Sequence, residues 1–148
     1  MGTRRKSREL ALQALFQGEM AGKDGLLVFD EFCAHFQVNK KSIPYAKKLM
    51  EGIQEKADVL NQLISKYAEN WRLERMSLID RNILRLAVYE VHYQDDVPVS
   101  VAINEAVEIA KRYSTDDSGP FINGILDAMA KEEASGAESN TKSIEPKL

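Results

Sequence analysis

The chain has 148 residues, of which 44% are hydrophobic and 29% are charged, and its formal net charge is −3 at pH 7. This length suits one folded domain with its own core. No apolar run is long enough to cross a bilayer, and the basic start lacks the apolar segment of a secretory signal. The single cysteine, Cys33, excludes an internal disulfide framework and indicates a reducing cytoplasm.

The charge is unevenly distributed along the chain. Residues 1–8 hold Arg4, Arg5, Lys6 and Arg8 and no acid, so the remainder is more acidic than the net charge indicates. A basic arm on an acidic body suits a polyanionic partner held at one end. Charge alone is equally compatible with a solvated, frayed terminus.

Hydrophobic periodicity in the first half predicts helices, and strand-like alternation is nearly absent. The first helix is expected over residues 4–20 and the second over residues 26–36, with the segment 22–25 breaking the chain between them. Ser42 is a candidate N-cap, with Pro44 in the first turn of a helix that continues towards residue 67. A break is expected near Gly52 or Asp58.

The second half predicts further helices over residues 77–93, 99–113 and 118–131. Ser77 and Asp80 fit a variant of the capping box. The helix that follows is apolar on nearly all of its sides, which is typical of a helix at the centre of a domain. Tyr113 is expected to point inward. Residues 132–148 lack apolar periodicity and are expected to form a disordered polar tail. The prediction is an all-α, single compact domain (residues 1–131) of six or seven helices in two helical subdomains.

The sequence offers little for catalysis. Cys33 and His35 are two positions apart on a predicted helix and therefore point to different sides. Glu105 and Glu108 share a helix face, but Glu108 also stands four positions before Arg112, which favours a surface ion pair. No cysteine and histidine spacing suits a metal. We therefore expect no enzyme activity, no metal and no cofactor.

Groups that bind RNA are better placed. Arg5 and Phe16 are eleven residues apart and point almost the same way on a helix, so a base could stack on the ring beside an arginine. Arg4 and Arg8 project on the side of Leu15, which requires the first turns to overhang the core or fray. Phe121 lies at the margin of an apolar stripe near a helix N-terminus, where amides favour anions. Spacing alone favours a core position for both rings.

Three stretches in order together resemble the NusB family of transcription antitermination factors. They are RRKSRELALQALFQGEM, DRNILRLAVYEVHYQDDVP and VAINEAVEIAKRYSTDDSGPFINGILD, and the resemblance covers about residues 4–131. It implies two helical subdomains and binding of boxA-type RNA, a short single-stranded element of leader transcripts. The implied protein partner is ribosomal protein NusE, acting with a transcribing RNA polymerase complex and other Nus factors on ribosomal RNA operons.

The resemblance also implies where the binding surfaces lie. Carried over by motif, the RNA surface comprises Arg4, Arg5, Lys6, Arg8, Phe16 and Phe121, with Asp117 close by as an acid that should oppose phosphate binding. Phe16 stands where the family often has tyrosine, which keeps stacking and removes one hydrogen bond. The NusE surface is expected around the start of helix 77–93, at Asp80 and Glu74.

Two other functions stay open at this point. A NusB-like domain also occurs fused ahead of RNA cytosine methyltransferases, where it would target an enzyme; this chain shows no cofactor-binding glycine motif and would serve such an enzyme only in trans. The third possibility is a helical scaffold that binds protein and no RNA. The basic cluster argues against such a scaffold, and an RNA-binding assay distinguishes it from an RNA-binding protein.

Overall fold

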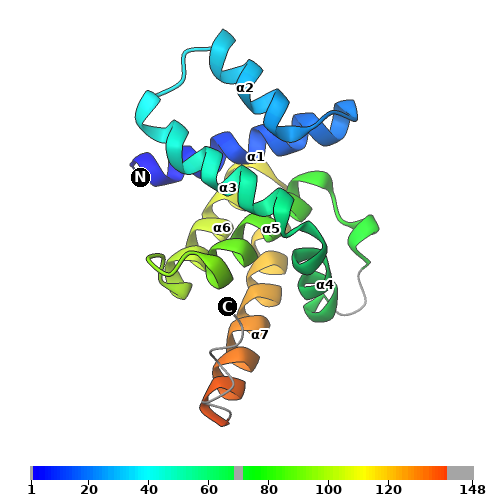
Figure 1. The fold of residues 1–148 in the computed structure, drawn as a ribbon. Coiled ribbons are helices and arrows are strands. Elements are labelled where there is room, and N and C mark those ends of the chain that lie inside the picture. The colour runs from blue at the N-terminus through cyan, green and yellow to red at the C-terminus, as the bar shows by residue number, and fades with distance from the viewer. Residues whose placement is uncertain (1, 69–71, 140–148) are drawn as a thin grey trace.

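The computed structural model describes residues 2–68 and 72–139, and every regular element within them is a helix (Figure 1). The α-helices are α1 (Thr3–Ala21), α2 (Gly25–His35), α3 (Ile43–Glu55), α4 (Ala57–Tyr67), α5 (Leu78–Tyr93), α6 (Val99–Tyr113) and α7 (Ser118–Ser139). Two 3-10 helices, η1 (Lys40–Ser42) and η2 (Leu73–Arg75), precede α3 and α5. The expected all-α fold is confirmed.

The helices form two groups that share one core. α1, α2 and α3 pack on one another in the upper part of Figure 1, and α4, α5, α6 and α7 pack below them. α5 joins the groups because it contacts α1 and α3 as well as α4, α6 and α7. Residues 86–90 of α5 are all buried, which confirms the central position expected for this helix.

Local signals set several helix ends. Gly22 ends α1 with a left-handed φ of 68°, which glycine adopts without steric cost. The Ser77 hydroxyl accepts the Asp80 amide at 3.1 Å and so caps α5, as expected. Ser42 stands at the N-cap of α3, with Pro44 in the first turn, as expected, but its hydroxyl makes no cap hydrogen bond and donates to the Asn39 carbonyl at 2.7 Å instead.

A close contact between α3 and α5 joins the two groups. Gly52 of α3 is buried, and a Cβ built there would overlap the ring of Tyr89 on α5. Only glycine lets the aromatic ring approach the α3 backbone so closely. The break expected near Gly52 or Asp58 falls between these residues, at Lys56, which separates α3 from α4.

The last helix is longer than the sequence indicated. We expected α7 to end near Lys131 and a disordered tail to begin at Glu132, but the helix continues to Ser139. Glu132 accepts a hydrogen bond from Tyr67 of α4, and Glu133 lies 2.8 Å from Nε2 of His92 on α5. These polar contacts hold the turn at Glu132 and Glu133 without apolar periodicity, so the tail does not begin at Glu132 as expected. Residues 140–148 lie outside the described part of the chain.

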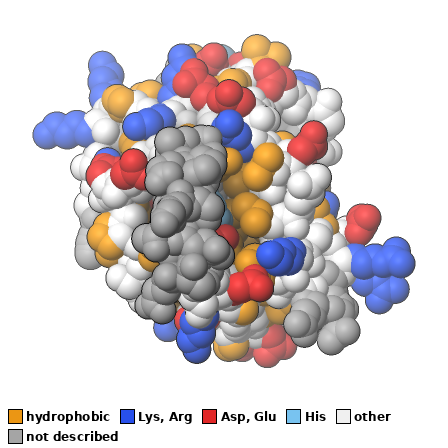
Figure 2. All heavy atoms as spheres, turned by 60° about the horizontal axis from the view of Figure 1, so that its bottom comes forward, with side chains coloured by type: hydrophobic (Ala, Val, Ile, Leu, Met, Phe, Trp, Pro, Cys, Tyr) orange, Lys and Arg blue, Asp and Glu red, His pale blue; other side chains and the backbone are white. Residues whose placement is uncertain are grey.

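The surface carries charges of both signs. Figure 2 shows one face of the molecule, where Lys and Arg side chains alternate with Asp and Glu side chains around a strip of hydrophobic ones. In the part of the chain that the structure describes, no helix combines the length and apolar character that crossing a membrane requires.

Candidate nucleic-acid interface

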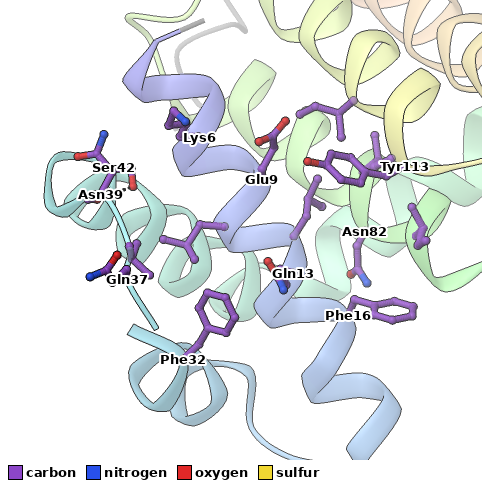
Figure 3. A pocket seen from close by; sticks show the side chains of 16 residues that line it. Lys6, Glu9, Gln13, Phe16, Phe32, Gln37, Asn39, Ser42, Asn82 and Tyr113 are labelled. Atoms are coloured by element: carbon purple, nitrogen blue, oxygen red, sulfur yellow. Dashed lines mark hydrogen bonds between the residues drawn. The ribbon is translucent and has the colours of Figure 1, made fainter. Parts of the chain in front are cut away.

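A groove with a volume of about 490 Å³ runs along the outer face of α1. Lys6, Glu9, Gln13 and Phe16 follow one another along this helix, and all of them line the groove (Figure 3). On one side it is bounded by residues of α2 and of the link to η1, and on the other by residues of α5 and α6. The remaining lining residues are Leu10, Leu12, Phe32, Gln37, Val38, Asn39, Ser42, Ile79, Asn82, Ile83, Ile109 and Tyr113.

Two aromatic rings stand on the α5 and α6 side of this groove. Phe16 is half-buried, so its ring is partly open to solvent at the margin of the α1 core face. Tyr113, at the end of α6, is 49% exposed, and its expected inward orientation is therefore wrong. Burial raises the pKa of its hydroxyl, so the ring is neutral at pH 7. The sequence pattern did not reveal this exposure, because Tyr113 continues the spacing of the buried residues of α6 but is the last residue of the helix.

The basic run at the start of α1 does not form a free arm. Arg8 is buried with 3% exposure, and its Nε lies 2.9 Å from both carboxylate oxygens of Glu90, which is fully buried. Tyr45 donates a further hydrogen bond to the same carboxylate. The expectation that Arg8 binds phosphate from an overhanging turn is wrong, because a buried carboxylate on α5 provides the partner that a core position requires.

The arginines before Arg8 are also paired, although they lie nearer the surface. Arg5 binds Glu105 of α6 through Nε and Nη2, at 2.8 and 2.6 Å, and this bidentate contact lowers the pKa of the Glu105 carboxyl. Arg4 lies 2.9 Å from Asp96, and its guanidinium lies 3.8 Å from the centre of the Tyr45 ring. These contacts dock the first turns of α1 against α6 and the preceding loop.

Lys6 differs from the arginines around it. It is exposed, it lines the groove, and it has no ion pair among the described residues. The acid that lines the groove, Glu9, is held by Arg112 at 3.0 Å. Lys6 is therefore the member of the basic run whose charge is available to a ligand in the groove.

Phe121 and Asp117 lie near the start of α7. Phe121 is half-buried, packs against the core, and does not line the groove; its amide donates to the Asp117 carbonyl at 3.2 Å. The Asp117 residue is exposed. The start of α7 is tied to α5, because Asp80 accepts hydrogen bonds from Ser114 at 2.7 Å and Ser118 at 2.9 Å. Ile79, the neighbour of Asp80 in sequence, lines the groove, whereas Phe121 does not.

The two acids expected to contact a protein partner, Asp80 and Glu74, differ in whether their carboxylates already have partners within the chain. Asp80 is partly exposed, but both of its carboxylate oxygens are occupied by the hydroxyls of Ser114 and Ser118. Glu74 is exposed on η2 and takes part in no ion pair within the described residues. The structure therefore gives Asp80 a role in joining α5 to α7 and leaves Glu74 available to a partner.

Other reactive groups do not assemble into a site. Burial raises the pKa of the Cys33 thiol, and the ring of His35 contacts the Glu31 carbonyl one turn away. Among residues 2–68 and 72–139, no three acidic, histidine or cysteine side chains are grouped to hold a metal. The expected Glu108–Arg112 pair is wrong, because Arg112 reaches across to Glu9 on α1.

The all-helical fold and the elongated groove on its first helix define a class of helical proteins with a surface binding site. A model described as the NusB family matches residues 5–131. The transcription antitermination protein NusB of Desulfosudis oleivorans is 47% identical over 135 residues, which cover 89% of this chain and 88% of the relative. The chain belongs to the NusB family.

Solved structures agree with this assignment. The T. maritima NusB structure has a TM-score of 0.79 and 44% identity, covering 87% of this chain and 91% of that one. A crystal structure of antitermination factors NusB and NusE in complex with double-stranded RNA has a TM-score of 0.79 and 26% identity. It covers 89% of this chain and 98% of the matched chain.

Proposed function

We propose that this chain is a transcription antitermination factor that binds boxA-type single-stranded leader RNA together with ribosomal protein NusE. It acts in the cytoplasm on a transcribing RNA polymerase complex with other Nus factors, promotes transcription of ribosomal RNA operons, and catalyses no reaction. Family membership supports this function. The structural observation that carries it is the groove along α1, which places a partly open aromatic ring and an unpaired lysine on one face.

The RNA surface we propose is centred on this groove. Phe16 and Tyr113 offer rings on which bases stack, and Lys6 binds a phosphate. Phe121 extends the surface towards α7. Arg4, whose side chain is 45% exposed, and Arg5, at 25%, contribute positive potential from their ion pairs at the edge, whereas Arg8 serves the core.

Two acids bound the surface that we propose. Asp117 is exposed close to Phe121, so its charge opposes an approaching phosphate and tempers the affinity. On the side of η2, Glu74 faces the basic surface of NusE, and Asp80 shapes that region through its bonds to α6 and α7.

Electrophoretic mobility shift of a boxA-type leader RNA, with and without NusE, tests this function. We expect a complex with this chain alone and a tighter one with NusE, since coupling between two ligands of one protein is commonly about 5–150-fold. A scrambled RNA of the same length is the control. Equal binding of both RNAs, or no complex in either condition, contradicts the proposal.

A further inference from the structure

The side of the groove opposite Phe16 carries a second aromatic platform. Phe32 of α2 and Phe36, the C-cap residue of α2, stack on each other, with ring centroids 4.6 Å apart and 27° between the ring planes. Phe32 is the member of this pair that lines the groove, whereas Phe36 is 60% exposed. An exposed ring held in place by a second ring offers a flat apolar face at a low entropy cost.

The segment after this platform is held in one conformation. Asn39 accepts the amide of Lys41 on its side chain at 2.9 Å, and its carbonyl accepts the hydroxyl of Ser42 at 2.7 Å. Ser7 of α1 donates to the Ser42 carbonyl at 2.7 Å. These bonds fix η1 against α1, so the side chains of Lys40 and Lys41 project from a preorganised turn.

The charges around this wall favour an anion. Lys6, Lys40 and Lys41 are exposed and have no ion pair among the described residues, in contrast to the paired arginines at the start of α1. The charged residues that line the groove are Lys6 and Glu9, and Glu9 is paired with Arg112; Lys40 and Lys41, like Asp30 and Glu31 of α2, lie outside the lining. The amide side chains of Gln37 and Asn39 do line the groove and add donors and acceptors.

We propose that this wall is a second nucleotide-binding site, which takes the segment of single-stranded RNA that continues past Phe16 across α1. Phe36 stacks on a base, and Lys6, Lys40 and Lys41 bind phosphates. The inference rests on the proposed function, because it extends the same groove to a longer stretch of the same RNA. A row of cations beside an open ring is the combination that single strands recognise, whereas a docking helix needs a longer apolar stripe.

Fluorescence anisotropy with two lengths of boxA-type RNA tests the second site. The probes are about 6 and about 12 nucleotides long, within the span of known single-strand sites. The variants are Phe36→Ala and the double variant Lys40→Ala with Lys41→Ala. Their matched controls are Leu27→Ala, an apolar α2 residue 54% exposed, and Lys47→Ala with Lys48→Ala, which removes the same charge from exposed positions on α3.

We expect Phe36→Ala to weaken binding of the long RNA by roughly ten- to hundredfold and to leave the short RNA unchanged. The lysine double variant should lower the slope of log affinity against log salt by about 1.4 for the long RNA, at about 0.7 for each phosphate contact. The control variants should match the wild type. Because Phe36 and both lysines are exposed, all variants should keep the wild-type melting temperature.

Three outcomes overturn the inference. In the first, Phe36→Ala and the lysine variant bind the long RNA like the wild type, which leaves the Phe16 site and the proposed function standing. In the second, the variants weaken NusE binding and spare RNA binding, which makes this wall a protein surface. In the third, the wild type binds neither RNA, and the proposed function fails with it.

Discussion

Lys6 and Arg8 are two positions apart on α1, and their side chains leave the helix on opposite faces. Lys6 is exposed beside the groove, whereas Arg8 is enclosed against the fully buried Glu90. Arginine suits the buried position because its planar guanidinium binds a carboxylate in a fixed geometry and stays charged. Neighbouring cations in one basic run therefore differ in their surroundings: Arg8 is paired in the core, and the charge of Lys6 remains open to solvent.

Arg8→Met should destabilise the fold by about 3–5 kcal/mol, because it leaves the Glu90 carboxylate buried without its cation. Urea denaturation followed by circular dichroism measures the free energy of unfolding. The control is the double variant with Glu90→Gln, in which Tyr45 still has an oxygen to donate to. It should recover most of the loss; a double variant as unstable as Arg8→Met would show that the pair is not the cause.

At the scale of helices, α3 and α5 meet through Gly52 and Tyr89. Gly52→Ala should cost about 1–3 kcal/mol, since the added methyl group overlaps the Tyr89 ring. Gly124 of α7 is the matched control, because a Cβ there meets no atom within 4 Å. Gly124→Ala should stabilise the protein by about 0.5–1 kcal/mol through helix propensity. Thermal unfolding of both variants checks the prediction, and equal effects of the same sign would contradict it.

The docking of α1 on α6 should depend on pH through Glu105. Arg5 holds the pKa of this carboxyl below its ordinary value, so the folded state favours the charged form. Its stabilisation is complete above about pH 4.3, the ordinary pKa of an unfolded glutamate, and is lost as the pH falls through the lowered folded pKa. Glu105→Gln should therefore be about 1–2 kcal/mol less stable than the wild type at neutral pH.

Urea titrations of both proteins between about pH 7 and pH 3 follow this gap, which should shrink on acidification. The control is Glu108→Gln, because Glu108 lies one turn further along α6 and makes a surface pair with Lys111. That variant should differ little from the wild type at any pH. A Glu105→Gln gap that widens as the pH falls would contradict the assignment.

Most helix positions could be predicted from the sequence because the signals that set them are local. Ser77 caps the start of α5 and Gly22 ends α1, and each of these signals acts within a few residues. The apolar residues on nearly all sides of α5 are likewise read directly from its own sequence. The pairing of Arg8 could not be predicted, since Glu90 is 82 positions away and the choice between burial and exposure depends on it. The continuation of α7 beyond Lys131 could not be predicted for the same reason, because Glu133 contacts His92 on another helix.

At the scale of the whole molecule, both helical groups line the groove that we propose as the RNA site. α1 contributes the length of the groove, the first group adds the side that holds Phe32, and α5 and α6 add the side that holds Tyr113. The family resemblance implied an RNA-binding role for Phe16 and Lys6, although spacing alone favoured a core position for Phe16, and both residues line the groove. Tyr113 joined them only through the packing of α6 beside α1, which no local pattern encodes.

The effect of Phe16→Ala on binding of boxA-type RNA tests the central claim, that the groove along α1 is the RNA site. Met20→Ala is the matched control, because Met20 is 65% exposed on the same helix but does not line the groove. Phe16→Tyr keeps the ring and serves as the conservative variant. We predict that Phe16→Ala loses about 1–3 kcal/mol of RNA affinity at equal melting temperature, that Met20→Ala binds like the wild type, and that Phe16→Tyr binds at least as tightly as the wild type. Wild-type affinity in Phe16→Ala, or the same loss in Met20→Ala, would contradict the account.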